Sequence, residues 1–202
     1  MPGISDYWAF VAAVLVFLAL PGPGTFTLLT ATAKGGLRAG TAATFGVIAG
    51  DQVLMWLAVA GVAAILQANE TLFKALQYVG AAYLVWVGIR LLLVRAGSAR
   101  PVALKPGHFA RQAFLITLMN PKAIMFYMAF FPLFIDAERH QGFVTFAAMA
   151  ATIAVITLAY CLALCAVASA VGERLRPHRW LAVALQRVAG VALIGFGLRL
   201  SR

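Results

Sequence analysis

The stretch FVTFAAMAATIAVITLAYCLALCAVASAV, residues 143–171, contains no Asp, Glu, Lys or Arg. A helix needs about 20 predominantly apolar residues to cross a bilayer. The run is continuous rather than alternating, which favours a helix over a barrel strand. Its two cysteines, Cys161 and Cys165, are four residues apart and so share one helix face. We interpret both as small apolar packing residues rather than a disulfide or a metal site.

The same apolar character extends over the whole chain of 202 residues, of which 63% are hydrophobic and 11% charged. Soluble domains carry about 25% charged residues. Together with a mean hydropathy of +0.94, this composition excludes an ordinary soluble domain and a disordered chain. We therefore predict an all-α integral membrane protein with six transmembrane helices. The predicted spans are Tyr7–Thr30, Gly40–Leu66, Leu72–Val94, Ala113–Ile135, Phe143–Val171 and Trp180–Leu200.

The basic residues predict the orientation of these spans. Sixteen Lys and Arg face six Asp and Glu, for a net charge of +10. Ten of the sixteen fall in the three connections on one side, which should be cytoplasmic, so both termini should face outward. Because these residues are split among short loops, we expect attraction to anionic membrane lipids and no nucleic-acid binding. The ten are Lys34, Arg38, Arg90, Arg95, Arg100, Lys105, Arg111, Arg174, Arg176 and Arg179.

Two spans contain residues that break a helix. Pro21-Gly22-Pro23-Gly24 interrupts the first span, and Asn120-Pro121 interrupts the fourth. Proline removes a backbone donor and clashes with the preceding turn, and glycine weakens a helix further. Both breaks lie well inside their spans, roughly 21 and 12 Å from the first residue at 1.5 Å per residue. Broken helices at matching positions are typical of transporters built from inverted repeats.

A weak internal repeat supports the same architecture. Gly80–Leu91 of the third span and Gly190–Leu200 of the sixth both run from a glycine to a closing Gly-Ile/Leu-Arg-Leu. Three spans per half place the two halves in opposite orientations. We therefore predict one polytopic domain over residues 1–202, made of inverted three-helix repeats at about 7–94 and 113–200.

Lipid cannot satisfy the backbone of a broken helix, so such a break must face protein or a water-filled cavity. Half-helix N-termini suit a carboxylate and half-helix C-termini suit an ammonium group, and an amino acid carries both. We therefore predict a substrate site at the two breaks, with Thr25 as the best hydroxyl candidate. The substrate-binding residues proposed on this basis are Pro21, Gly22, Pro23, Gly24, Thr25, Asp51, Asn120, Pro121 and Lys122.

Two charged residues lie deep within these spans. Asp51 lies about 18 Å into the second span, where a charge costs about 2.5–3.5 kcal/mol. It is predicted to bind the substrate amine or to carry the coupling proton, and the alternative is a structural ion pair with Lys122. For Lys122 we weigh two roles equally: a contact with the substrate carboxylate, and the ion pair with Asp51. Before Asp51 comes Gly46-Val47-Ile48-Ala49-Gly50, whose spacing favours close helix packing.

These motifs resemble the lysine-exporter superfamily, and its homoserine/threonine resistance (RhtB-type) branch above all. The resemblance rests on Pro21–Gly24, Gly46–Asp51, Tyr83-Leu84 with Gly88, and Leu118-Met119-Asn120-Pro121-Lys122-Ala123, and it covers essentially the whole chain. It implies a secondary transporter that exports homoserine, threonine or another neutral amino acid across the bacterial inner membrane. It also implies that the proton gradient drives export. The motifs do not fix the substrate.

Two other functional classes fit the sequence less well than amino-acid export. A cation or metal exporter would need clustered Cys, His or carboxylates, and the spans offer one Asp and two cysteines. An integral-membrane enzyme would need a nucleophile with a nearby base, whereas His108, His140 and His178 lie in or beside loops. We therefore expect no enzymatic activity, no cofactor and no bound metal. Homo-oligomerisation stays open, since small-residue patterns serve internal packing and dimerisation equally.

Overall fold

A computed structural model describes residues 3–68, 102–136 and 142–171 continuously. Within these ranges the regular secondary structure is helical apart from one isolated β-bridge. The predicted third and sixth spans, with the Gly80 and Gly190 motifs that suggested a repeat, lie mostly outside the described residues. Isolated described positions occur at 71, 75, 78, 79, 82, 85, 86, 89, 92, 93, 187, 191, 194, 195 and 198.

The first helix, α1 (Tyr7–Ala19), has a defined cap at each end. The Asp6 side chain accepts a hydrogen bond from the Ala9 backbone N–H at 2.9 Å, which is an N-cap. The helix ends at Leu20, which is extended (φ −71°, ψ 113°) because the following Pro21 disfavours the helical conformation. The break predicted at Pro21–Gly24 is therefore present, since the next helix begins only at Pro23.

Helix α2 (Pro23–Ala68) contains the predicted boundary between the first two spans as a short interruption. We predicted a first span ending at Thr30 and a second beginning at Gly40. Within this interval Gly35 and Gly36 have non-helical backbone, so two helical segments meet there and the chain changes direction. Gly36 has φ +66°, in the left-handed region that residues with a side chain rarely adopt. A two-residue kink thus replaces the expected loop.

The kink predicts that only glycine is well tolerated at residue 36. Substituting Gly36→Val should lower the stability of the purified protein by about 1–2 kcal/mol or more, since a β-branched residue is strained at positive φ. Gly61→Val is the matched variant, because Gly61 lies in the same helix without a positive φ and a methyl there meets no atom within 4 Å. Thermal unfolding in detergent measures the difference. Equal midpoints for Gly36→Val and wild type would contradict a left-handed residue here.

The second half of the described chain repeats this order of elements. Helix α4 (Phe109–Leu118) is separated from α5 (Pro121–Phe130) by the predicted Asn120-Pro121 break. The 3₁₀ helix η1 (Phe131–Phe134) and a connection then lead to α6 (Phe143–Val171), whose bounds match the predicted fifth span. The fourth span was predicted to start at Ala113, but its helix begins at Phe109. Half-helix, break, half-helix and long helix thus occur twice.

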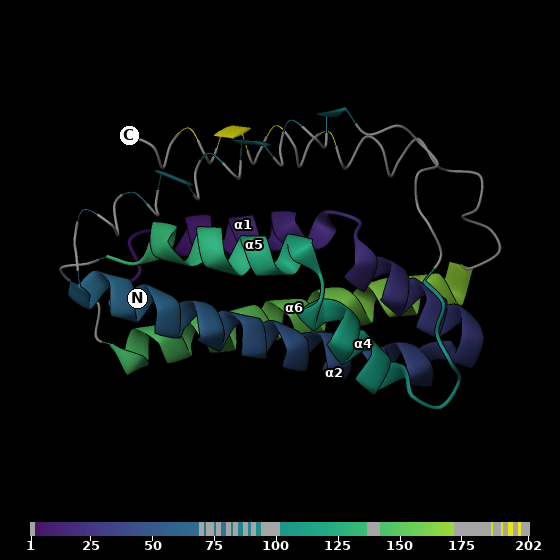
Figure 1. Cartoon of the computed structure of the whole chain (residues 1–202). Coiled ribbons are helices and arrows are strands. Elements are labelled where there is room, and N and C mark those ends of the chain that lie inside the picture. Colours follow the sequence, from purple (N-terminus) through teal and green to yellow (C-terminus); the bar gives the residue numbers. More distant parts are fainter. Residues whose placement is uncertain are drawn as a thin grey trace.

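The helices form an elongated bundle in which α1 and α5 lie beside one another over α2 and α6 (Figure 1). Two stretches in it, Pro23–Gly61 and Phe143–Ala170, are long and apolar enough to cross a membrane. At one end the chain before α1 pairs with the chain after η1. Ser5 N–H donates to the Phe134 carbonyl at 3.1 Å, and Asp136 N–H donates to the Gly3 carbonyl at 3.1 Å.

Glycines allow α2 to approach its neighbours closely. A methyl group at Gly46 would overlap the backbone carbonyl of Ala110, and one at Gly50 would lie 2.8 Å from Thr117 Cβ. The Gly46–Gly50 pair therefore packs directly on α4, as its spacing predicted. Gly40 likewise allows α2 to pack closely against α6, since a methyl there would lie 2.9 Å from Cys165 Sγ.

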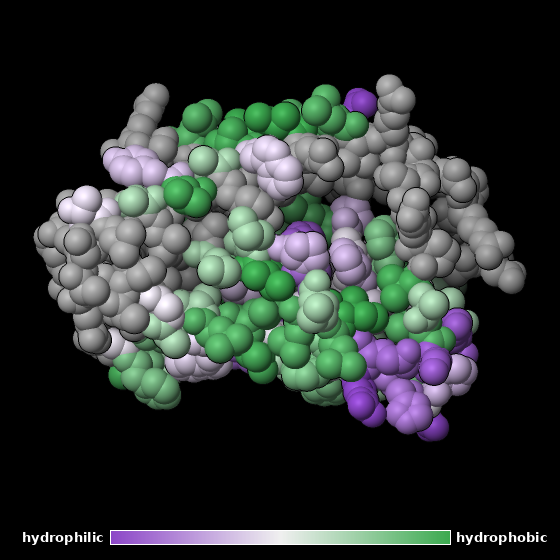
Figure 2. Space-filling view, in the orientation of Figure 1, coloured by the Kyte–Doolittle hydropathy of each residue, from purple (hydrophilic) through white to green (hydrophobic). Residues whose placement is uncertain are grey.

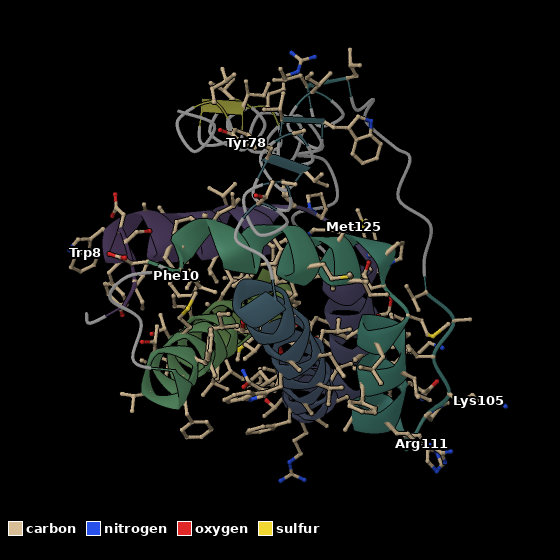
Figure 3. The ribbon with its side chains drawn as sticks, turned by 60° about the vertical axis from the view of Figure 1, so that its left-hand side comes forward. Trp8, Phe10, Tyr78, Lys105, Arg111 and Met125 are labelled. Atoms are coloured by element: carbon tan, nitrogen blue, oxygen red, sulfur yellow. The ribbon has the colours of Figure 1, made fainter. Side chains whose placement is uncertain are left out.

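Polar and apolar surfaces are segregated. Figure 2 shows mostly hydrophobic residues along the described bundle and hydrophilic residues gathered at the end where α4 begins. Lys34 Nζ donates to the Leu104 carbonyl at 2.7 Å there, and Arg38 lines a groove with Arg111. Lys105 extends at the same end, away from Trp8 (Figure 3). The described basic residues of the first two connections, Lys34, Arg38, Lys105 and Arg111, thus share one end of the molecule.

Candidate substrate site

The two helix breaks are in direct contact. Lys122, in the first turn of α5, donates hydrogen bonds from Nζ to the Leu20 carbonyl at 2.6 Å and to the Phe17 carbonyl at 3.0 Å. These carbonyls belong to the end of α1, which leads into Pro21–Gly24. Gly22 lies against the same side chain, since a methyl there would be 3.2 Å from Lys122 Cδ. The sequence predicted that these segments meet, and the structure places them together.

Asn120 begins the second half-helix at the other break. Its Oδ1 accepts a hydrogen bond from the Lys122 backbone N–H at 3.1 Å, and its carbonyl accepts one from Ile124 N–H at 3.0 Å. Asparagine is a preferred N-cap, and proline is well suited to the first helical position that follows. Asn120-Pro121 therefore ends one helix and starts the next, with a helix N-terminus directed toward the break.

A cavity of about 40 Å³ lies where the breaks meet. It contacts both apolar clusters of the bundle, one around Phe17 and Phe126 and the other around Leu28 and Val47. Six of the nine predicted binding residues line it, namely Gly22, Gly24, Thr25, Asp51, Asn120 and Lys122. Pro21, Pro23 and Pro121 do not line it. The other lining residues are Phe17, Leu18, Leu28, Val47, Thr117, Ala123, Tyr160 and Cys161.

Asp51 is 3% exposed and reaches the cavity from the middle of α2. The Tyr127 hydroxyl of α5 is its hydrogen-bonding neighbour, and Lys122 attracts it electrostatically. Lys122 Nζ, however, donates its hydrogen bonds to the Phe17 and Leu20 carbonyls at the end of α1. It lies 4.4 Å from the centre of the Phe17 ring. An acidic and a basic group thus face one small cavity, and the basic one is held by the opposite half of the chain.

Sequence reasoning missed several lining residues. Thr117, in the last turn of α4, is 2% exposed, and its hydroxyl has no hydrogen-bond partner within the described part of the chain. Its position three residues before Asn120 was a signal that could have identified it. Cys161 is buried as predicted, yet it also lines the cavity. Tyr160 also lines the cavity, and Tyr127 reaches the site through its hydrogen bond with Asp51. Both lie among apolar residues whose pattern does not indicate a site.

Broken helices that meet at a cavity inside an apolar bundle are typical of membrane transporters. Comparison with known proteins agrees. The chain belongs to the LysE type translocator family, whose profile matches residues 15–202. This confirms the resemblance inferred from the Pro-Gly-Pro and Asn-Pro-Lys motifs.

Three relatives illustrate the similarity. The chain is 34% identical to a leucine efflux protein of Enterobacter sp. (strain 638), and the match covers 98% of this chain and 96% of the relative. It is 32% identical to a leucine efflux protein of Salmonella choleraesuis and 33% identical to one of Klebsiella pneumoniae, with the same coverage. No solved structure matches the chain.

Proposed function

We propose that the protein exports a neutral amino acid across the bacterial inner membrane, with leucine as the first candidate, and that inward proton movement drives export. The observation that carries this proposal is the cavity at the two helix breaks, which Asp51 and Lys122 both line. Full-length similarity to proteins named for leucine efflux supports the substrate class. The protein would then bind the amino-acid substrate and protons, and membrane lipids would surround it.

The chemistry of the cavity suits the two charges of an amino acid. The α5 N-terminus at Asn120 offers partial positive charge to a carboxylate. The Asp51 carboxylate and the C-terminal carbonyls of α1 offer negative charge to an ammonium group. The Thr25 and Thr117 hydroxyls add hydrogen-bonding capacity. The remaining wall is largely apolar, which favours an aliphatic side chain over a charged one.

The cavity must widen before it accepts such a substrate. A volume of about 40 Å³ accommodates only a few water molecules, because each needs roughly 10–15 Å³ of this kind of space. Movement of one half of the bundle against the other would supply the room and switch access between the two sides. The repeated order of half-helices on either side of the cavity supports an inverted repeat of this kind.

The basic residues support an orientation of the bundle in the membrane. The end of the bundle that carries Lys34, Arg38, Lys105 and Arg111 would face the cytoplasm, since basic residues are retained on that side. The termini would then lie outside. Asp51 would carry the proton, and the titratable groups around it are Tyr127 and Lys122 of α5 and Cys161 of α6.

The substrate is identified by a toxicity panel. Cells that lack their own amino-acid exporters receive dipeptides that release leucine, threonine, homoserine or lysine internally. Overexpression should relieve growth inhibition by the leucine dipeptide and leave lysine toxicity unchanged. Direct measurement of labelled leucine in everted vesicles provides the transport rate. Relief from cadmium with no relief from any amino acid would overturn the proposal in favour of a metal exporter.

A further inference from the structure

The Lys122 ammonium occupies a cage built from the end of another helix. Two main-chain carbonyls, those of Phe17 and Leu20, accept hydrogen bonds from Nζ at 3.0 and 2.6 Å. The Phe17 ring lies below the ammonium at 4.4 Å from its centroid. Carbonyl oxygens and an aromatic face are the groups that bind an ammonium ion. The Asp51 carboxylate adds electrostatic attraction.

The sequence explains why these carbonyls can also accept from a cation. In a continuous helix the residue-17 carbonyl would accept from the N–H of residue 21, but residue 21 is proline and has none. The Phe17 carbonyl instead accepts a hydrogen bond from the Leu20 N–H at 3.3 Å, and its second lone pair is available to Lys122. Helix C-terminal carbonyls carry partial negative charge, and hydrocarbon offers them no hydrogen-bond donor. Gly22 leaves room for the incoming side chain, because a methyl there would lie 3.2 Å from Lys122 Cδ and 3.6 Å from Nζ.

We propose that the C-terminal end of α1 is a binding site for a primary ammonium cation, and that the Lys122 side chain is its tethered occupant. The site joins the two halves of the chain, because Lys122 begins α5 whereas the carbonyls end α1. Its role in transport rests on the proposed function. The ammonium group of an amino acid has the same chemistry and competes with Lys122 for these carbonyls, and the displaced Lys122 is then available to the substrate carboxylate.

The test removes the tethered cation and supplies a free one. Purified Lys122→Ala should unfold at a midpoint lower than wild type by roughly 6 °C or more, the smallest shift expected when two charge-assisted hydrogen bonds are lost. Ethylammonium chloride should restore at least half of this shift in a saturable manner, because a ligand that binds only the folded state stabilises it. Choline chloride at the same ionic strength should not, since its nitrogen has no N–H.

Lys34→Ala is the matched control. Lys34 also donates from Nζ to a single carbonyl, that of Leu104, but it is exposed at the basic end of the bundle. Ethylammonium should not raise the unfolding midpoint of the Lys34→Ala variant above the midpoint of wild type. Equal effects of ethylammonium on wild type, Lys34→Ala and Lys122→Ala would overturn the proposal. So would a Lys122→Ala protein as stable as wild type without added cation.

A second pair of variants covers the case in which Lys122→Ala does not accumulate in the membrane. Lys122→Arg keeps the positive charge and Lys122→Met keeps most of the side-chain volume. Accumulation of Lys122→Arg without Lys122→Met supports a cation site, whereas equal accumulation and equal unfolding midpoints of the two contradict it. These readouts do not depend on amino-acid transport. A negative result with transport intact would therefore reject the cation site alone, and failure of transport with a positive result would reject the proposed function alone.

Discussion

Everted vesicles that contain Asp51→Asn should fail to accumulate labelled leucine when a proton gradient is imposed, whereas wild-type vesicles accumulate it. One proton crossing a potential of 100 mV supplies about 2.3 kcal/mol, which supports an accumulation ratio of roughly 50-fold. The substituted amide would keep the shape of the carboxylate but could not carry a proton, so the ratio should fall to about one. Labelled leucine uptake with and without an uncoupler gives this ratio.

Two further measurements separate coupling from folding. Exchange of internal for external leucine without a gradient should persist in Asp51→Asn at raised leucine concentrations, because exchange needs no net proton movement and only the carboxylate contact with the substrate ammonium group is lost. Asp6→Asn is the matched control, since Asp6 caps α1 outside the cavity and asparagine caps a helix about as well. Gradient-driven accumulation in Asp51→Asn at the wild-type ratio would reject Asp51 as the coupling residue.

The second large effect concerns the contact between α2 and α4. Gly46→Val should reduce the amount of folded protein in the membrane several-fold, because its side chain would overlap the Ala110 backbone carbonyl. Backbone cannot move aside as a side chain can, and overpacking of this kind costs about 1–3 kcal/mol or more. A loss of that size changes protein abundance several-fold. Quantitative immunoblots of membranes, with unfolding midpoints of the purified protein, measure it.

Gly61→Ala is the control for this prediction, because it lies in the same helix and a methyl there meets no atom within 4 Å. It should leave abundance unchanged or raise it slightly, since alanine favours a helix by about 1 kcal/mol over glycine. If Gly46→Val and Gly61→Ala behave alike, the close approach of α2 to α4 is wrong.

The sequence was most informative where a residue has few alternatives. Pro21 and Pro121 forced helix breaks, and the Gly46–Gly50 spacing indicated a close contact. Both results depend on local chemistry that a single sequence displays. The apolar run at 143–171 likewise predicted a long helix, because no charged residue interrupts it. The meeting of the breaks followed from the need of exposed backbone for partners.

Tertiary geometry decided what the sequence left open. The Gly35–Gly36 kink lies within the connection predicted between Thr30 and Gly40, but the sequence did not predict that only two residues would leave the helical conformation. Lys122 had two equal interpretations, and neither included the α1 carbonyls, since nothing local points from residue 122 to residues 17 and 20. Thr117 and Tyr127 lie at the site because they contact α2. The periodicity of apolar residues in the sequence does not predict such contacts.

The pairing of residues 3–5 with residues 134–136 has a consequence for which substitutions this end of the bundle tolerates. Main-chain atoms form both of its hydrogen bonds, so exchanging the side chain of Ser5 or Asp136 leaves the donors and acceptors in place. Changes at Ile4 or Ile135 should be felt more strongly, because both side chains are buried and their backbones form the bridge between the two segments.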